Sequence, residues 1–456
     1  MKIIIAGIGK LGEYLARELV EEKHDVTIID ISFDKHSNII NNEDLNYIKG
    51  NALDSDILIE AGVSNTDLII SVMEKDEQNV MCCLLGKKLG AKHTIARIRT
   101  PEYAASLNVI KDEIGLSMTI NPEILTARHI ARIISIPNAL DVNTFFKGRL
   151  QLTSFKVEED CNLVGMNLIS LIKKVSNNVI VCAIERDGNT IIPVGNTVIE
   201  ENDILHVTGR RKDIIKVLQY ANLLKEKVKD VMMVGGSSTA VYLAELLEEM
   251  NINNKIIEID PIRCQELSEK LPKSLIIQGD ATNEDLLYEE DIKDMDAFVA
   301  LNSIDEENII LSLFAKLNNV PKVITKINHI NLEGVINKVG IDSIITPHKI
   351  ASNQIVKYVR AMIEGESSSC ESIYKFNDKN FECVEFIVKN NFKALNIKLK
   401  NINFKKNTII AAIWRDRNII FPSGNDEIKE KDTIIVVHEN KVIKEINDIL
   451  ENNYEK

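Results

Sequence analysis

The first thirty residues constrain the fold of this chain more than any other stretch. Met1–Ala6 is a short apolar run that suits a buried parallel strand, and apolar residues then recur at helical spacing. A second apolar strand, Val26–Ile29, follows and ends at Asp30. The glycines of a G-x-G-x-x-G motif separate the first strand from the helix: Gly7, Gly9 and Gly12. This order of elements, with an acid at its end, predicts a dinucleotide-binding site.

Each part of the motif has its own physical reason. Gly7 permits a tight turn, Gly9 lets backbone N–H groups approach a pyrophosphate, and Gly12 allows close packing of helix on sheet. The helix N-terminus offers unpaired N–H groups and a positive dipole end to phosphates. Asp30 suits the ribose hydroxyls and disfavours a 2′-phosphate, so NAD(H) is expected rather than NADP(H). The alternative is a turn without a ligand, and the coincidence of strand, helix and acid argues against it.

Length and charge exclude several classes of protein. The chain has 456 residues and a net charge of −13, which argues against nucleic-acid binding and against electrostatic attachment to an anionic bilayer. No apolar run approaches the roughly 20 residues of a membrane span, and the N-terminus does not resemble a signal peptide, so a cytoplasmic location is expected. Seven scattered cysteines without C-x-x-C predict reduced, buried thiols, and the histidine spacing predicts no metal site.

Strands and helices alternate through the first 136 residues, which predicts an α/β, doubly wound parallel sheet with its ligand at the carboxyl edge. The later strands expected in this sheet are Leu45–Gly50, Asp67–Val72, His93–Ile98, Asn108–Ile110 and Met118–Ile120. An amphipathic helix, Glu123–Ser135, begins after Pro122, where a missing N–H costs nothing. Residues 150–210 instead predict a small α+β module.

The whole pattern then recurs. Gly235 stands 228 positions after Gly7 (235 − 7), and Glu258 stands 228 positions after Asp30 (258 − 30). We therefore predict a tandem duplication of a Rossmann-like domain followed by a small α+β module. The predicted Rossmann-like domains are residues 1–136 and 228–363, and the predicted small modules are residues 140–222 and 371–453. The predicted linkers inside the two halves are Pro137–Lys147 and Glu364–Cys370.

These features resemble RCK domains, which regulate potassium conductance. The specific parts are the glycine motif with Asp30, the stretch Ile95–Tyr103, and the duplication. The tandem form resembles the peripheral subunit of bacterial and archaeal Trk potassium-uptake systems. The resemblance implies a non-enzymatic cytosolic subunit that binds NAD(H), with ATP or ADP as further ligands. It also implies a homo-oligomeric ring that gates an integral-membrane potassium-translocating subunit of the TrkH or TrkG type.

The resemblance also implies which residues form the first site. The phosphate cradle comprises Gly7, Ile8, Gly9, Lys10, Leu11 and Gly12, and Asp30 holds the ribose. The residues expected to border the adenosine are Asn51, Ala52, Met73 and Glu74. Arg97 is expected to face the phosphates, in preference to a surface charge or a salt bridge to Asp76 or Glu77. For Arg99 the phosphate and surface interpretations are equally supported.

The second site departs from the pattern. Its predicted residues are Gly235, Gly236, Ser237, Ser238, Thr239, Glu258 and Asp280. Ser237 stands where the second glycine is expected, and its Cβ lies where a pyrophosphate would approach. Lys326 and Asn328 replace Arg97 and Arg99. We hypothesise that this site binds nucleotide more weakly or prefers a ligand with fewer phosphates.

Two other functions are considered. An NAD-dependent oxidoreductase would need a substrate domain and a proton-transfer residue, and the sequence indicates neither. A regulator of another cation transporter, such as a cation–proton antiporter, fits the sequence equally well. The two helices that begin after a proline, Glu123–Ser135 and Lys349–Ile363, could simply cover the sheet. Their resemblance to the family's crossover helices, through which Rossmann-like domains pair, favours an interface instead.

Overall fold

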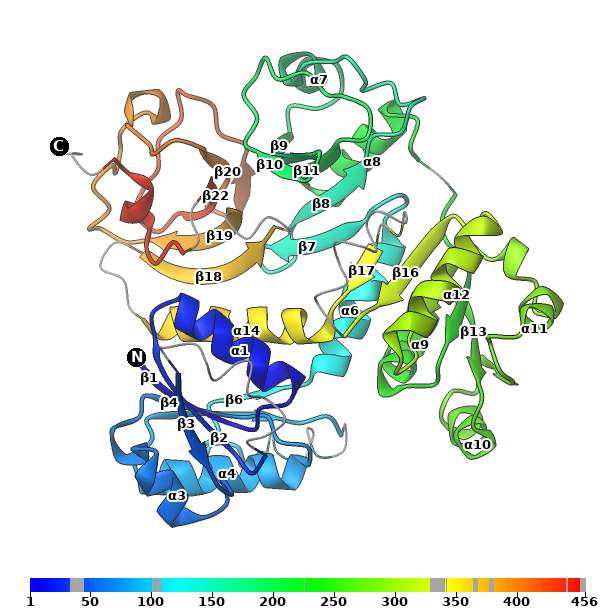
Figure 1. Ribbon diagram of the computed structural model, residues 1–456. Coiled ribbons are helices and arrows are strands. Elements are labelled where there is room, and N and C mark those ends of the chain that lie inside the picture. Colours follow the sequence, from blue (N-terminus) through cyan, green and yellow to red (C-terminus); the bar gives the residue numbers. More distant parts are fainter. Residues whose placement is uncertain are drawn as a thin grey trace. The chain divides into compact units, whose positions relative to one another are not determined.

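The predicted duplication is confirmed: two Rossmann-like parallel sheets are each followed by an antiparallel sheet (Figure 1). The computed structural model describes residues 1–32, 45–100, 103, 107, 109–224, 226–328, 341, 343–363, 368–376, 381–439 and 442–451. The chain divides into two compact units, the first of which comprises Met1–Ala127, Lys326–Asn331 and Thr346–Val356. The second unit comprises the remaining residues.

The first parallel sheet has the strand order β3-β2-β1-β4-β5-β6. Its strands are β1 (Lys2–Ala6), β2 (Asp25–Asp30), β3 (Leu45–Lys49), β4 (Leu68–Ser71), β5 (His93–Arg97) and β6 (Met118–Ile120). The central strand β4 is buried along its whole length, as its apolar run Leu68–Ile70 requires, and it ends at the buried Ser71. The strand order reverses between β1 and β4, so the crevice of a doubly wound fold lies at their carboxyl ends.

The helices of this half are α1 (Lys10–Glu21), α3 (Ser55–Glu60), the 3₁₀ turn η1 (Val63–Asn65), α4 (Asp76–Leu89) and α6 (Pro122–Ser135). Helix α1 buries Leu11, Leu15 and Leu19, the stripe that its periodicity predicts. The short strand predicted at Asn108–Ile110 is wrong, because Val109 and Ile110 are helical; Asn108 lies outside the described residues. The sequence also predicts a helical stretch between Asp30 and the strand at Leu45, and this stretch falls on residues 33–44, which lie outside the described residues.

The first small module is an antiparallel sheet of order β10-β9-β11-β8-β7. Its elements are β7 (Asp141–Phe145), β8 (Leu150–Lys156), α7 (Leu168–Lys174), β9 (Val179–Arg186), β10 (Asn189–Ile191), β11 (Ile204–Gly209) and α8 (Arg211–Tyr220). The linker predicted at Pro137–Lys147 is therefore wrong in part, since it contains β7, which pairs with β8.

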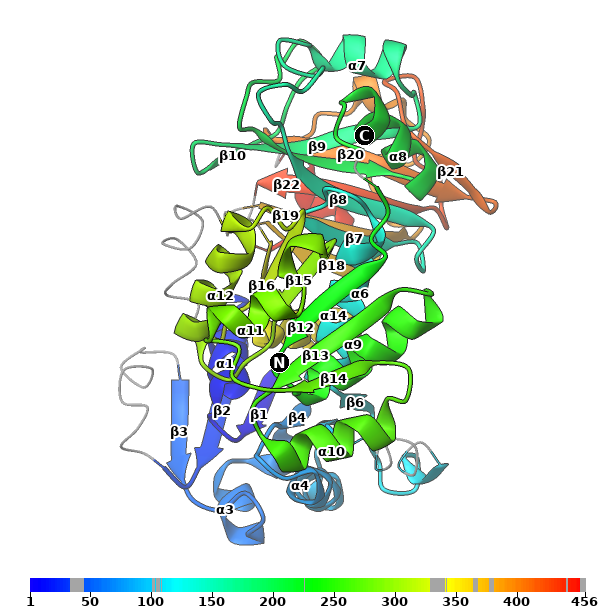
Figure 2. The ribbon, with the colours of Figure 1, turned by 90° about the vertical axis from the view of Figure 1, so that its right-hand side faces the viewer.

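The second parallel sheet repeats the first, with the order β14-β13-β12-β15-β16-β17 (Figure 2). Its strands are β12 (Asp230–Val234), β13 (Asn253–Glu258), β14 (Leu275–Gln278), β15 (Ala297–Ala300), β16 (Lys322–Lys326) and β17 (Ser343–Ile345). Its helices are α9 (Ser238–Glu249), α10 (Pro261–Lys270), α11 (Glu284–Glu289), η2 (Ile292–Asp294), α12 (Asp305–Leu317) and α14 (Pro347–Met362).

The second small module has the strand order β18-β19-β22-β20-β21. Its elements are β18 (Ser368–Lys375), β19 (Phe381–Val388), η5 (Leu399–Asn401), β20 (Thr408–Arg415), β21 (Asn418–Ile420), β22 (Thr433–Glu439) and η6 (Ile446–Ile449). The linker predicted at Glu364–Cys370 is wrong for Ser368–Cys370, which open β18; residues 364–367 lie outside the described residues.

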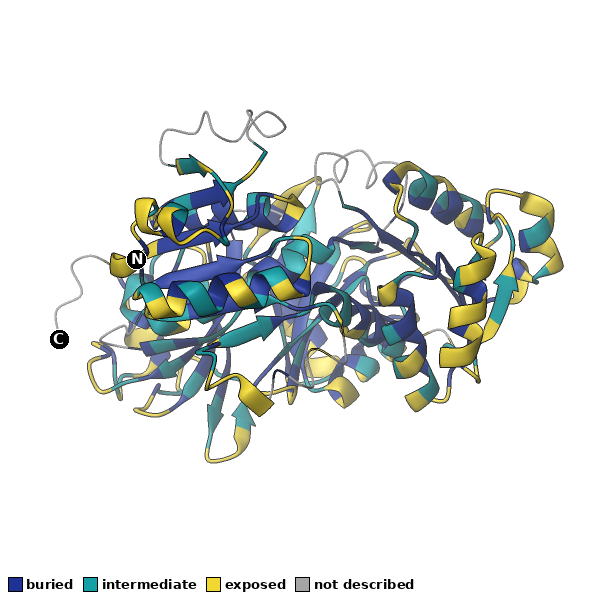
Figure 3. Ribbon diagram, turned by 90° about the horizontal axis from the view of Figure 1, so that it is seen from below, coloured by how far each residue is buried: buried dark blue, intermediate teal, exposed yellow. Residues whose placement is uncertain are grey.

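The two small modules share one hydrophobic core. Phe145, Phe146 and Leu150 of the first module pack in the same cluster as Phe376 and Phe381 of the second. Figure 3 shows that the strands are largely buried, whereas the helices alternate buried and exposed residues. The sheets therefore supply the cores, and helices such as α1 and α4 keep one face in contact with solvent.

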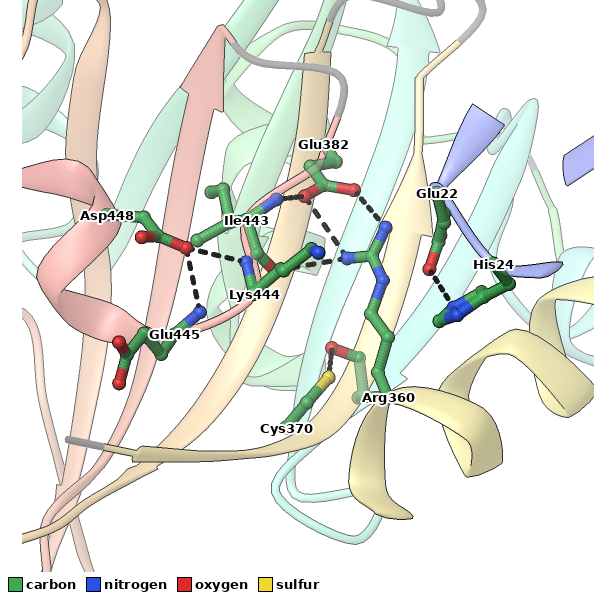
Figure 4. Close-up of polar contacts among 10 residues, drawn as sticks. Glu22, His24, Arg360, Cys370, Glu382, Ile443, Lys444, Glu445 and Asp448 are labelled. Carbon is green, nitrogen blue, oxygen red and sulfur yellow. Dashed lines mark hydrogen bonds and ion pairs between the residues drawn. The ribbon is translucent and has the colours of Figure 1, made fainter. Parts of the chain in front are cut away.

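A buried ion pair anchors the last turn of α14 to the second small module (Figure 4). Arg360 Nη1 and Nη2 donate to Glu382 Oε1 at 3.2 Å and Oε2 at 3.0 Å. Glu382 Oε1 also accepts the Ile443 N–H at 2.6 Å. Burial raises the pKa of Glu382, and the charge and hydrogen bonds of Arg360 oppose that rise. The pair fixes the end of α14 on β19.

Candidate nucleotide-binding clefts

The first glycine turn has one glycine that the fold does not require. Gly7 has a φ of +98°, and a Cβ there would stand 3.0 Å from Met73 N. A Cβ at Gly12 would stand 2.0 Å from Gly7 O, so helix α1 could not pack as it does. At Gly9 an added Cβ would meet nothing within 4 Å. Open space therefore lies in front of Gly9, at the amino end of α1.

The amino end of α1 is suited to an anion. Gly9 is the N-cap residue of α1, and no side chain caps the helix there. The first N–H groups of a helix have no partner within it and carry the positive end of its dipole. Of the side chains predicted here, Lys10 is exposed, whereas Ile8 and Leu11 are buried. Ile8 and Leu11 therefore offer no side chain to a ligand, and the Ile8 N–H already donates to Asp30.

Asp30 is fixed beside this turn by two backbone hydrogen bonds. Its Oδ2 accepts the Ile8 N–H at 2.8 Å, and its Oδ1 accepts the Ser32 N–H at 2.7 Å. The carboxylate thus stands at the tip of β2, next to the glycine turn, where a ribose on that turn would find it. Asn51 and Ala52 directly follow β3, the neighbouring strand, and Ala52 is buried whereas Asn51 is exposed.

Asn79 joins the ends of β4 and β5. Its Oδ1 accepts the Met73 N–H at 2.7 Å, and its Nδ2 donates to Met73 O at 3.0 Å and to Arg97 O at 2.9 Å. The side chain is fully buried and all these bonds are short, so the two strand ends hold a fixed spacing. Sequence reasoning did not assign Asn79 to the site, although the D-x-x-N pattern of Asp76–Asn79 was the signal for it.

The two arginines lie at the same edge. Arg97 Nη2 donates to Met73 O at 2.5 Å, and Arg99 Nη2 donates to Glu74 O at 2.5 Å. Burial lowers the pKa of Arg97, and the neighbouring charge of Arg99 adds to that effect. Asp76 accepts the Arg99 N–H at 3.1 and 3.0 Å. The guanidinium groups thus contact the backbone that borders the predicted adenosine site.

Glu123 is a residue that sequence reasoning missed. It lies in the first turn of α6, and burial raises the pKa of its carboxyl, while the charges of Arg99 and Arg97 lower it. The nearby Asn121 binds the start of this helix to the segment that follows β5, because its Nδ2 donates to Arg99 O at 3.0 Å. An acid directly after Asn121–Pro122 was the available signal, since that dipeptide begins a helix at the carboxyl edge of the sheet.

The second cleft repeats the turn with altered side chains. Gly235 has a φ of +94°, and Gly236 N donates to Glu258 Oε2 at 2.7 Å, as Ile8 N does to Asp30. Ser237 is the N-cap residue of α9, and its Oγ accepts the Ala240 N–H at 3.4 Å. Ser238 and Thr239 form the first turn of α9. The side-chain cap is the main difference from α1.

Two further residues border the second cleft. Asp280 accepts the Thr282 N–H at 2.9 Å and its hydroxyl at 2.7 Å, and these bonds lower the pKa of Asp280. Sequence reasoning missed Arg263 of α10, whose Nε donates to Gly236 O at 2.8 Å and whose Nη1 donates to Glu266 at 2.7 Å. Its signal was a basic residue at the start of the helix that follows Glu258.

The described part of the chain lacks two other kinds of site. It contains no group of three or more His, Cys, Asp or Glu side chains that could hold a metal ion. None of its helices is both long and apolar enough to cross a membrane. The structure places the predicted first-site residues at the carboxyl ends of β1 to β5, and their contacts with a nucleotide stay a prediction.

Comparisons with known proteins fit this architecture. The TrkA-N domain matches residues 3–122 and 231–347, and the TrkA-C domain matches residues 152–222 and 383–451. A Trk system potassium uptake protein TrkA homolog 1 from Methanosarcina mazei is 29% identical over 444 residues, covering 96% of this chain and 97% of the relative. The Trk system potassium uptake protein TrkA of Haemophilus influenzae is 30% identical, covering 96% of this chain and 95% of the relative.

Solved structures show the same fold. The structure described as the GsuK channel bound to NAD has a TM-score of 0.63 at 16% identity, and the match covers 96% of this chain and 76% of that chain. The crystal structure of the GsuK RCK domain has a TM-score of 0.62 at 17% identity, and the match covers 96% of this chain and 92% of that chain. With both domain types matched twice and relatives aligned over nearly the full length, this chain belongs to the TrkA family of Trk system potassium uptake proteins.

Proposed function

We propose that this chain is a cytosolic regulatory subunit that senses NAD(H) in its first cleft and gates a potassium-translocating protein of the membrane. The observation that carries the proposal is the open amino end of α1, where Gly9 is not needed by the fold and no side chain caps the helix. The choice of potassium as the transported ion comes from the family, since its relatives are named for potassium uptake.

The first cleft offers each part of NAD(H) a suitable partner. The pyrophosphate would lie on the N–H groups of α1, and the ribose hydroxyls would donate to Asp30. Arg97 and Arg99 already border the cleft through Met73 and Glu74 and can turn a guanidinium toward phosphate. ATP and ADP share the same adenosine and phosphate chemistry, so we propose them as competing ligands of this cleft.

Gating requires that the nucleotide bind one conformation of an assembly better than another. We propose a homo-oligomeric ring on the cytosolic side of the membrane. The described surface supports an interface between copies, because α12 exposes Ile310 by 66% and Leu317 by 81%, and the neighbouring Tyr288 is exposed by 42%. The corresponding helix of the first half, α4, exposes Met81 by 47%.

The test is potassium uptake by cells that carry Asp30→Ala or Arg97→Ala, together with NADH binding by the purified variants. We expect both variants to lose NADH affinity by about tenfold or more and to lose nucleotide-dependent uptake. The matched controls are Asp25→Ala, an exposed acid on the same strand, and Arg17→Ala, an exposed arginine of α1. Unchanged affinity and uptake in the Asp30 and Arg97 variants would contradict the proposal.

The oxidoreductase alternative makes a different prediction. Such an enzyme would oxidise NADH when mixed with carbonyl substrates, whereas a sensor would bind NADH without turnover. Sustained oxidation that Asp30→Ala abolishes would overturn the regulatory proposal. For the transported ion, uptake measured with sodium in place of potassium separates potassium uptake from regulation of another cation transporter.

A further inference from the structure

The second half keeps the glycine that the fold needs and changes the one that it does not. Gly235 repeats the positive φ of Gly7, and Ala240 stands at the place of Gly12 as a small, fully buried residue. The second glycine of the motif, Gly9, is the one that is replaced, by Ser237. Because an added Cβ at Gly9 meets no atom within 4 Å, packing alone gives no reason for glycine there. The altered position is therefore the one where a ligand, rather than the fold, requires glycine.

The backbone at the two positions is nearly the same, so the side chain is what distinguishes the clefts. Gly9 has φ −61° and ψ 179°, and Ser237 has φ −66° and ψ 167°. The Ser237 Oγ accepts the Ala240 N–H, one of the donors that an anion at the end of α9 would use. Helix α9 is thus capped by its own chain.

The basic groups of the second cleft are also less suited to phosphate than those of the first. Lys326 and Asn328 stand where the first half has Arg97 and Arg99, so the planar guanidinium groups are absent from these two positions. Arg263 does reach the glycine turn, but its Nε donates to Gly236 O and its Nη1 to Glu266. Glu258 keeps the role of Asp30, since it accepts the N–H of the turn. The second cleft therefore keeps the acid that would hold a ribose, whereas Ser237 occupies an N–H group that would hold a phosphate.

We infer that Ser237 excludes a dinucleotide pyrophosphate from the amino end of α9, so that each chain binds one dinucleotide, in its first cleft. The inference builds on the proposed function, because it takes the first cleft to be the NAD(H) site. It makes position 237 the determinant of specificity between two clefts of one fold. The chain is then an asymmetric sensor, with one cleft for a dinucleotide and one that rejects it.

The test measures how many NADH molecules the purified full-length chain binds, by equilibrium dialysis at saturating NADH. We expect one per wild-type chain, two for Ser237→Gly, none for Gly9→Ser, and one for the double variant. Ser237→Ala is the matched variant, because it removes the cap and keeps the Cβ; we expect it to remain at one. In Ser237→Gly the second cleft should gain affinity of about tenfold or more, since an additional N–H then binds phosphate.

Circular dichroism and the midpoint of thermal unfolding confirm that each variant folds. Two NADH molecules per wild-type chain would overturn the inference, and so would a folded Ser237→Gly variant that still binds one. If the wild type binds none and Ser237→Gly binds one, the inference about Ser237 stands and the proposed function fails. If neither protein binds NADH, both are contradicted.

Discussion

At the scale of single residues, the molecule contains a carboxyl group whose ionisation is linked to folding. Glu385 of β19 accepts the Phe146 N–H at 3.2 Å, across the junction of the two small modules. Burial raises its pKa to about 7, and Glu371 adds to the rise, while the Phe146 N–H, Lys357 and Lys147 oppose it. Phe146 itself has a φ of +50°, so the second module holds a strained turn of the first.

The sign of the pH dependence follows from that raised pKa. Between the ordinary carboxyl pKa of 4.5 and about 7, the folded chain binds more protons at Glu385 than the unfolded chain does. Stability from this group is therefore greatest at low pH and falls as pH rises to about 7, by at most about 3 kcal/mol. Glu385→Gln, which cannot ionise, should remove this part of the dependence.

The measurement compares thermal unfolding midpoints of wild type and Glu385→Gln at pH 5 and pH 8. The midpoint of the variant should rise relative to that of wild type as the pH increases. The exposed Glu430→Gln of the same module is the control and should show no such trend. A difference between wild type and Glu385→Gln that is the same at both pH values would contradict the role of Glu385.

Single residues also show where sequence reasoning reaches its limit. The glycine motif and Asp30 could be placed because each has a strict steric or hydrogen-bonding demand. Asn79 and Arg263 act by joining segments that are distant in sequence, and such contacts follow from the fold rather than from local pattern. Glu123 depends on the approach of α6 to two arginines, which one sequence does not reveal.

At the scale of elements, the apolar strands were predictable and the polar ones were not. Strand β4 is apolar from Leu68 to Ile70 and fully buried, so its type followed from composition. Strand β7 has the sequence DVNTF and leads into a turn at Phe146 and Lys147, both with positive φ. Hairpin turns of this kind usually contain Asn-Gly or Asp-Gly, and neither is present here. The usual signal of a hairpin was therefore missing, and the region was predicted to be a linker.

The anchor at the end of α14 allows a prediction for an element. Arg360 and Glu382 are each only 2% exposed in their side chains, so removal of one partner leaves a buried, unpaired charge. We expect Arg360→Met to destabilise the chain by about 3–5 kcal/mol, and the double variant with Glu382→Gln to lose less. Chemical unfolding and hydrogen exchange of the last turn of α14 measure both effects.

The matched control is Arg17→Met, which breaks an ion pair with Glu13 on α1 whose side chains are 52% and 32% exposed. That exposed pair should contribute less than about 1 kcal/mol. Equal losses for the Arg17 and Arg360 variants would show that burial of the second pair has no energetic consequence.

At the scale of the whole molecule, the two halves are copies whose registers differ locally. In the small modules Arg186 and Arg415 lie 229 positions apart (415 − 186), and this sequence offset aligns Gly165 with Ala394. The structure instead aligns Gly165, with φ +76°, with Asn396, with φ +59°, an offset of 231. The bridges Asn167–Val198 and Lys398–Glu427 agree with this shift. The two-residue difference lies after Asn167 and Lys398 of these bridges, where the first module has helix α7 and the second has the shorter η5, and sequence comparison alone did not detect it.

The overall architecture was predictable because a duplication supplies its own evidence. A glycine turn, an acid and a strand order that recur at one spacing define the same fold twice. The surfaces that let copies assemble are not fixed in this way, since exposed apolar residues have no partner within the chain. Leu317 and Ile310 of α12 are such residues, and their exposure became visible only with the helix in place.

These exposed side chains lead to the prediction for the assembly. Ile310, Phe314 and Leu317 recur at helical spacing on α12, and Phe314 packs against Tyr288 with ring centroids 5.5 Å apart. A charge placed in an apolar interface between copies would be buried without a partner, at a cost of several kcal/mol. Ile310→Asp with Leu317→Asp should therefore reduce the oligomer to smaller species, as measured by light scattering after size-exclusion chromatography.

The control for assembly is Leu275→Asp, which places the same charge on an exposed residue of β14. It should keep the wild-type mass. The α12 variant should still bind NADH in its first cleft, because that cleft lies within one unit of one chain, but it should lose nucleotide-dependent potassium uptake. An unchanged mass would place the interface elsewhere, and uptake that persists in the smaller species would separate nucleotide sensing from the ring.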